Sequence, residues 1–202
     1  MMKPKVLLLD EPLSALDAQL RSSLRREIRK LNKALGTTMI FVTHDQEEAV
    51  EVADRIALMD DGRIAQCDKP EVFCQKPISL KVADFFGWQN FIPAKRNGNT
   101  AICALGEFEC HIHEDVASDG IPTIRPEAAY NVENGSIGGI LKDAQLKGAF
   151  SYCKVDCEGV ELMLSMRDSA IPPLGQPIAF DLDPTLMTLL PKVPDISDAS
   201  VG

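Results

Sequence analysis

Residues 6–17 read V-L-L-L-D-E-P-L-S-A-L-D, and this stretch decides the fold of the first part of the chain. Four apolar residues run directly into Asp10 and Glu11, and Pro12 ends the run. Such a run is typical of a strand buried on both faces of a parallel sheet. Ligands bind these sheets at the carboxyl ends of the strands, so two adjacent carboxylates there suit a Mg²⁺-nucleotide site. A buried strand followed by an ordinary acidic turn is the alternative.

An amphipathic helix is predicted over residues 18–35, with Asp17 as its N-cap and Gly36 at its end. Its apolar stripe consists of Leu20, Leu24, Ile28, Leu31 and Leu35. Its other face carries Arg21, Arg25, Arg26, Arg29, Lys30 and Lys33. We interpret this basic face as solvated, with a docking surface as the alternative.

A second apolar run, residues 37–43, predicts another buried strand, and His44 follows it directly. A strand, a helix and a strand form a right-handed parallel unit, which brings His44 to the same sheet edge as Asp10 and Glu11. A lone histidine is more often structural. Beside two carboxylates, however, its ring N–H can donate to a phosphate oxygen without titrating.

The remainder of this part predicts a helix over 46–53, a hairpin of strands 55–59 and 63–67 turning at Asp60-Asp61-Gly62, and helices over 70–75 and 79–86. The ordered segments LLLDEPLSALD, FVTHDQEEA, ADRIALMDDGRIAQ, a Pro-Glu-Val-Phe helix and F-F-G-x-x-N together carry a family resemblance. Residues 5–92 resemble the C-terminal part of an ABC transporter ATPase subunit, of the importer subgroup that includes the maltose, polyamine, sulfate and ferric-iron ATPases.

The resemblance implies a role for each matching residue. Residues 7–11 are similar to the Walker B strand, in which Asp10 would hold Mg²⁺ through water. Glu11 would be the general base that orients the attacking water. Ser14 and Asp17 belong to a segment that resembles the D-loop, which contacts the opposite subunit's site, and His44 matches the switch histidine that reaches the γ-phosphate of ATP.

Two motifs of a complete site are missing from this sequence. It contains no Gly-Lys dipeptide, and hence no glycine-rich loop to cradle phosphates, and no L-S-G-G-Q signature. We therefore expect the chain alone neither to bind ATP tightly nor to hydrolyse it. A truncated chain or gene remnant that begins just before Walker B is the leading explanation; a stand-alone regulatory protein or a split ATPase is the other. Loss of upstream strands would leave an exposed sheet edge or face.

From residue 88 the pattern changes to short apolar runs between Gly and Asn turns, which predicts a small barrel or sandwich. Ile124-Arg-Pro-Glu127 resembles the R-P-E segment of the TOBE domain, an OB-like β-barrel that follows the catalytic domain in this subgroup. We expect a partial P-loop NTPase-like α/β domain over 1–87, an all-β TOBE-like domain over 88–192, and a flexible tail over 193–202. A small-ligand site at Arg125 or at the His111/His113 face is the alternative to a purely structural role.

Charge and composition limit the possible partners. The net charge is −9, and residues 87–202 carry 8 basic against 16 acidic side chains, which argues against nucleic-acid binding. No apolar run approaches the roughly 20 residues of a membrane span. We expect a cytoplasmic protein held at the membrane by permease subunits, paired with a second ATPase subunit as a homodimer. The six cysteines form no C-x-x-C pair and are interpreted as reduced and structural.

Overall fold

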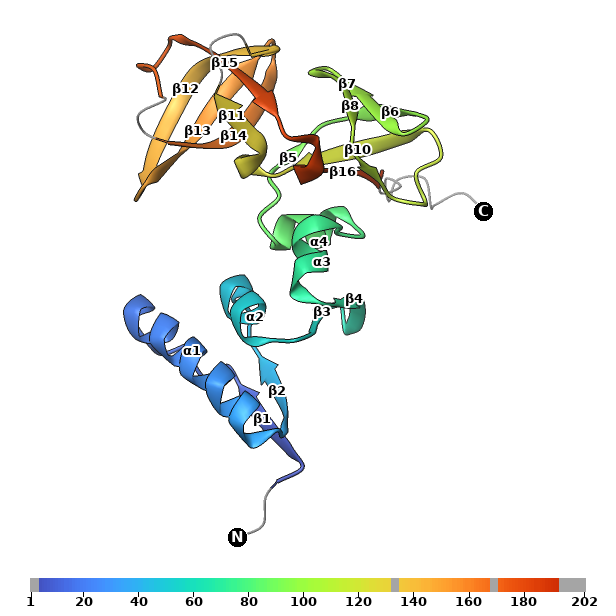
Figure 1. The fold of residues 1–202 in the computed structure, drawn as a ribbon. Coiled ribbons are helices and arrows are strands. Elements are labelled where there is room, and N and C mark those ends of the chain that lie inside the picture. The colour runs from blue at the N-terminus through green and yellow to red at the C-terminus, as the bar shows by residue number, and fades with distance from the viewer. Residues whose placement is uncertain (1–3, 132–134, 168–170, 193–202) are drawn as a thin grey trace. The chain divides into compact units, whose positions relative to one another are not determined.

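The computed structural model describes residues 4–131, 135–167 and 171–192, and the chain divides into two compact units, residues 1–74 and 75–202. Figure 1 shows the α/β elements of the first unit and the strands that dominate the second. The predicted boundary lay at residue 87, so helix α4 (Leu80–Phe85) falls in the second unit instead of the first. The Trp88 backbone N–H donates to Ala83 at the end of α4, and Arg125 from the β-rich region lies 5.7 Å over the Trp88 ring.

The first unit is built on two parallel strands, β1 (Val6–Asp10) and β2 (Thr38–Val42), with Asp10 opposite Val42 in the register. Helix α1 (Ala18–Leu35) connects them and lies alongside them (Figure 1). Asp17 caps α1 by accepting from the Leu20 N–H at 2.9 Å, and Gly36 ends it at a φ of +61°. Both predicted ends of this helix are therefore confirmed.

The prediction that the first strand is buried on both faces is wrong for this chain. Burial alternates along β1 and β2, because only one face of the pair is covered. The other face exposes an apolar patch, which we call the open sheet face: Val6, Leu8, Ile40 and Val42. Leu8 is 63% exposed. A parallel sheet is normally covered on both sides, and this face is the exposed surface that the sequence led us to expect.

The remaining elements of the first unit follow the predicted order. Helix α2 (Gln46–Val52) comes after β2, and β3 (Ile56–Asp60) and β4 (Arg63–Asp68) form an antiparallel hairpin. Helix α3 (Pro70–Gln75) follows, and only its last residue, Gln75, is counted in the second unit. Most bounds agree with the prediction within one or two residues. No helix of the described part of the chain is both long and apolar enough to cross a membrane.

The second unit contains a seven-stranded and a five-stranded sheet. The first consists of β5 (Asn90–Phe91), β6 (Ala94–Asn97), β7 (Thr100–Cys103), β8 (Gly106–Glu109), β9 (His111–Ile112), β10 (Asp119–Ile124) and β16 (Met187–Pro191). The second, in spatial order, runs β11 (Ala129–Asn131), β15 (Pro177–Leu182), β12 (Ile137–Lys147), β13 (Phe150–Cys157) and β14 (Val160–Arg167). Single 3-10 turns at Pro126–Ala128 and Pro184–Leu186 precede β11 and β16.

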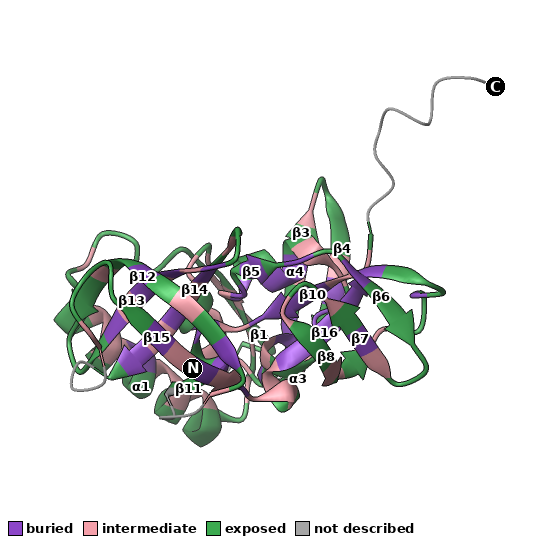
Figure 2. Cartoon of the chain, turned by 90° about the horizontal axis from the view of Figure 1, so that it is seen from above, coloured by how far each residue is buried: buried purple, intermediate pink, exposed green. Residues whose placement is uncertain are grey.

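The main core of the second unit lies on the inner face of the five-stranded sheet. Every second residue of β13 is buried, and so are Leu162, Leu164 and Met166 of β14, as the alternating colours in Figure 2 show. Cys153, Val155, Leu162, Leu164 and Phe180 have little or no exposed surface. Strict alternation of this kind is what a half-buried antiparallel sheet requires. The structure also contains short strands at residues 90–91, 94–97 and 129–131, which the sequence did not predict.

Asn90 joins the two sheets of this unit through its side chain. Its carboxamide N–H donates to the Met163 carbonyl at 2.9 Å and to the Ile124 carbonyl at 3.2 Å. Its oxygen accepts from the Met163 N–H at 2.6 Å. The side chain is 3% exposed, so it satisfies backbone groups of β14 that would otherwise be buried without partners.

Candidate functional site

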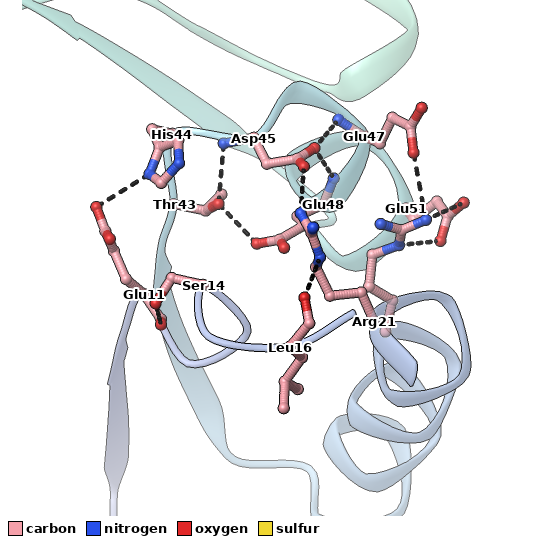
Figure 3. Close-up of polar contacts among 11 residues, drawn as sticks. Glu11, Ser14, Leu16, Arg21, Thr43, His44, Asp45, Glu47, Glu48 and Glu51 are labelled. Carbon is pink, nitrogen blue, oxygen red and sulfur yellow. Dashed lines mark hydrogen bonds and ion pairs between the residues drawn. The ribbon is translucent and has the colours of Figure 1, made fainter. Parts of the chain in front are cut away.

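The predicted site residues lie at the carboxyl edge of β1 and β2. Because these strands are parallel and in register, Asp10 and Glu11 from the first strand meet Thr43 and His44 from the second. The Glu11 N–H donates to the Val42 carbonyl at 2.9 Å and so extends the strand pairing by one residue. Figure 3 shows Glu11 and His44 pointing toward one another across this edge.

Glu11 and His44 form the central contact of the site. His44 Nδ1 lies 3.1 Å from Glu11 Oε1, and both side chains are largely open to solvent. Glu11 also has a φ of +42°, in the left-handed region that non-glycine residues rarely adopt. Such strain persists only where neighbouring contacts impose it, and it is enriched at functional sites. Here the backbone turn brings the Glu11 carboxylate to face His44.

The loop after Glu11 is held by its own hydrogen bonds. Ser14 donates through both its hydroxyl, at 2.9 Å, and its backbone N–H, at 3.3 Å, to the Glu11 carbonyl. Leu13 is 2% exposed, and its buried side chain anchors the loop. Asp17 is occupied as the helix cap, with its side chain on the Leu20 N–H. Ser14 and Asp17 therefore shape this loop, while Asp10 ends the strand on the exposed face.

A second layer of polar side chains fixes the backbone on both sides of His44, and the sequence did not identify it. Thr43 Oγ1 donates to Glu48 Oε2 at 2.7 Å and accepts from the Asp45 N–H at 3.0 Å. Asp45 caps α2 by accepting from the N–H groups of Glu47 and Glu48. Arg21 of α1 reaches Asp45 at 3.5 Å. Figure 3 shows this network surrounding the strand end that carries His44.

Glu48 is the least exposed member of this network, at 3%. A buried carboxylate needs hydrogen-bond donors, and the Thr43 hydroxyl supplies one. In the sequence, the only indication of a role for Glu48 was its position in the first turn of a helix, where acidic residues interact favourably with the helix dipole. Burial of that residue depends on the packing of α2 against α1, which no local pattern specifies.

The cavity at this edge is small. Its volume is about 30 Å³, and its lining consists of Glu11, Ser14, Arg21, Thr43, His44, Asp45 and Glu48. A cavity of that size holds one or two water molecules, not a nucleotide. The described residues alone therefore provide room and acceptors for water at Glu11.

The donor set at this edge fits Mg²⁺ only in part. Asp10 offers one carboxylate, and Mg²⁺ sites that also use substrate phosphates need one or two. Among the described residues, no group of three or more His, Cys, Asp or Glu side chains gathers closely enough to hold a metal ion. Asp10 is thus suited to a metal that brings phosphate oxygens and water as its other ligands.

The alternative ligand positions in the second unit have structural partners. Arg125 lies over the Trp88 ring at 5.7 Å and contacts Glu127 at 3.3 Å. His113 Nδ1 lies 3.3 Å from the Asp115 N–H. Burial, together with nearby Lys76 and His113, lowers the pKa of His111, which disfavours its charged form.

All six cysteines are free thiols. Burial raises the pKa of Cys110 to about 11, with a smaller contribution from Cys103. Burial likewise raises the pKa of Cys157 to about 11, with Asp156 and Glu158 adding to it. These thiols are protonated near neutral pH and are poor metal ligands or nucleophiles.

Comparison with known proteins reveals several similar importer subunits. The chain is 34% identical over 187 residues to the spermidine/putrescine import ATP-binding protein PotA of Borrelia garinii subsp. bavariensis, covering 91% of this chain and 53% of that protein. It is 40% identical over 159 residues to the Fe(3+) ions import ATP-binding protein FbpC of Rhizobium etli, covering 75% and 45% respectively. It is 44% identical over 125 residues to the sulfate/thiosulfate import ATP-binding protein CysA of Bacillus cereus, covering 61% and 35%.

The chain spans about half the length of the curated relatives it matches. No protein-family model matches it. One solved structure, the cytoplasmic molybdate-binding protein ModG, covers 52% of this chain and 96% of its own at 10% identity and a TM-score of 0.39. A TM-score below 0.5 does not establish a shared fold.

Proposed function

Because this chain belongs to the family of ABC importer ATP-binding subunits, we propose that it contributes one half of an ATP-hydrolysing site that drives solute uptake. The contact that carries this proposal is His44 Nδ1 to Glu11 Oε1, 3.1 Å apart at the carboxyl edge of a parallel strand pair. A carboxylate and an imidazole at such an edge can orient water and donate to a phosphate oxygen.

Each residue has a distinct part in this proposal. ATP supplies the phosphoryl group, and Mg²⁺ neutralises the charge that develops on it. Asp10 would hold the metal through water, and Glu11 would accept a proton from the attacking water. His44 would donate a ring N–H to the γ-phosphate, and Ser14 and Asp17 would present the D-loop to a second subunit.

We propose that the chain alone does not turn over ATP, since phosphoryl transfer depends mainly on positioning and electrostatic stabilisation by phosphate-binding groups. The absence of a glycine-rich loop from the sequence and the small cavity at Glu11 support this. A coupled phosphate-release assay on the purified chain should show no turnover. Turnover that Glu11→Gln abolishes would contradict the proposal.

A chimera tests the positive half of the proposal. This chain would replace the matching segment of the Borrelia PotA relative, which is about twice as long as the matched part. We expect ATP turnover that falls by about 10²- to 10⁴-fold with Glu11→Gln, as for loss of a general base. His44→Ala should reduce turnover similarly, while Ser118→Ala, an exposed change in the second unit, should leave it intact. A chimera that hydrolyses ATP equally well without Glu11 would overturn the assignment.

For the second unit we propose a TOBE-like regulatory domain with an OB-like barrel. Its own core and the Arg125-Pro-Glu127 segment support this assignment. In the intact transporter the partners would be a second ATP-binding subunit and transmembrane permease subunits. The protein would then lie in the cytoplasm, on the inner face of the membrane.

A regulatory module without enzyme activity is the second candidate function. The cavity beside Glu11, with room for water only, is the observation that favours it. Calorimetry with sugars and polyamines would detect a small-ligand sensor. The absence of heat with any of them, combined with an active chimera, would reject this candidate.

A further inference from the structure

A second cavity lies on the first unit, between α1 and α2, away from the residues assigned above. Its volume is about 300 Å³, and its lining consists of Ser22, Arg25, Arg26, Arg29 and Glu51. Arg25 and Arg26 lie three and four positions after Ser22, and Arg29 lies four and three positions after them, which places all four on one side of the helix. Three guanidinium groups thus meet one carboxylate in a single depression.

The three arginines of this cavity differ in whether a carboxylate neutralises their positive charge. Arg25 is 6% exposed and is neutralised by Glu51, at 2.7 Å, and Glu47, at 3.4 Å. The Glu51 side chain accordingly raises the pKa of Arg25, with Glu47 and Asp45 adding to it. The sequence had suggested that the arginines of this helix face are simply solvated, and for Arg25 that interpretation is wrong.

Arg26 and Arg29 donate hydrogen bonds to backbone carbonyls, and the charge of Arg26 makes a minor contribution, after that of Lys30, to lowering the pKa of the adjacent Glu27. Arg26 Nε donates to the Ser22 carbonyl at 3.4 Å, and Arg29 Nη1 donates to the Glu51 carbonyl. Within the described residues, no carboxylate lies within ion-pairing distance of either one. Each therefore retains its positive charge and several N–H donors at the rim of the cavity. Like charges three and four residues apart on a helix repel each other, and a bound anion would remove that repulsion.

We propose that this cavity binds a phosphate group. A carboxylate is planar and is satisfied by one guanidinium fork, which Arg25 already gives to Glu51. Phosphate has oxygens directed tetrahedrally and up to two negative charges, so Arg26, Arg29 and the Ser22 hydroxyl can all donate to it. The group belongs either to a soluble phosphate compound or to an anionic lipid headgroup. This inference does not depend on ATP hydrolysis at Glu11 and His44.

Two-dimensional NMR of the arginine Nε–H groups, recorded while inorganic phosphate replaces chloride at constant ionic strength, tests the proposal. We expect saturable shifts of the Arg26 and Arg29 signals. Arg26→Gln and Arg29→Gln should each weaken phosphate binding by about tenfold, the value of one hydrogen bond to a charged group. Lys33→Gln, on the same helix but outside the cavity, is the matched control.

Co-sedimentation with phosphatidylglycerol vesicles, against phosphatidylcholine vesicles, distinguishes the two sources of the phosphate group. Vesicle binding that Arg26→Gln and Arg29→Gln abolish identifies a lipid headgroup, and phosphate binding without vesicle binding identifies a soluble compound. Shifts that never saturate, or an equal loss of affinity in Lys33→Gln, would mean general charge screening and would overturn the proposal.

Discussion

His44 Nδ1 lies 3.1 Å from Glu11 Oε1, although 33 residues separate them in the sequence. The parallel register of β1 and β2 creates this proximity, because it aligns Asp10 with Val42 and leaves the next residues side by side. No helix or turn contact joins the two side chains. Their meeting is a property of sheet topology, and it persists as long as the two strands pair.

Glu11→Gln and His44→Ala should change the free energy of unfolding by less than about 0.5 kcal/mol. The two side chains are 48% and 75% exposed, and exposed ion pairs contribute little to stability. Urea denaturation followed by circular dichroism would measure both variants. A loss of 2 kcal/mol or more, on the scale of a buried pair, would show that the contact is structural.

Thr43→Val should destabilise the first unit by about 1–3 kcal/mol. The substitution keeps the branched shape but removes the hydroxyl that donates to Glu48 and accepts from the Asp45 N–H. Because Glu48 is buried, its carboxylate would lose a donor that water cannot easily replace. Thr38→Val, at an exposed position of β2, the strand that precedes Thr43, is the control and should be nearly neutral. Equal effects in both variants would count against the network.

The open sheet face predicts that the chain self-associates, and Leu8→Lys should reduce this association. Leu8 and its cross-strand neighbour Ile40 form the centre of the open sheet face, where they are 63% and 50% exposed. A charged side chain there opposes association between apolar faces and edges. Sedimentation velocity over a concentration series would compare it with the parent chain. Leu20→Lys, which adds the same charge on α1, should leave association unchanged if the sheet face is responsible.

Gly139→Ala should destabilise the second unit by about 1–3 kcal/mol, as overpacking typically does. A Cβ at this position would lie 2.5 Å from Val155 Cγ1 and 2.8 Å from Cys157 Sγ, both in the core. The adjacent Gly138 has no heavy atom within 4 Å of a Cβ, so Gly138→Ala is the matched control. Thermal unfolding of the two variants should separate them by several degrees.

Acidification should weaken the contact between Asp181 and Ser136. The Ser136 hydroxyl and backbone N–H both donate to Asp181 Oδ1, and these bonds lower the pKa of Asp181 in the folded state. A lowered folded-state pKa gives stability that is present above the unfolded pKa of about 3.9 and is lost as the pH falls through the folded value. Asp181→Asn should therefore reduce the loss of unfolding free energy that accompanies acidification, measured by urea denaturation at a series of acidic pH values. An unchanged pH dependence in this variant would contradict the prediction.

Local sequence patterns were sufficient to predict the helices and strands of the first unit. The spacing of leucines and the cap at Asp17 predicted α1 with both ends correct, because these signals depend on neighbours within one or two turns. The central contact of the candidate site could also be predicted, because the parallel topology brings Glu11 and His44 to the same edge of the sheet.

Features that depend on packing between elements could not be predicted in this way. Arg25 looked like one of several solvated arginines, yet it is buried against Glu47 and Glu51, which lie 22 and 26 residues further along the chain. The contact between Thr43 and Glu48 also gave no signal, because a hydroxyl five residues from a carboxylate matches no helix or strand period. The short strands at Asn90 and Ala129 form only because partner strands lie beside them.

The Asn90 carboxamide has a consequence for the order in which the second unit folds. Its bonds to Met163 close a loop of 73 residues, and fixing the ends of so long a loop in an unfolded chain costs roughly 3.8 kcal/mol of entropy. The two hydrogen bonds to Met163 contribute about 1 kcal/mol each, so they cannot nucleate this closure. We therefore predict that the Asn90 bonds form late, after β12–β14 have paired. Bonds formed after the folding transition state slow unfolding more than they accelerate folding, so replacing Asn90 should shorten the lifetime of the folded unit.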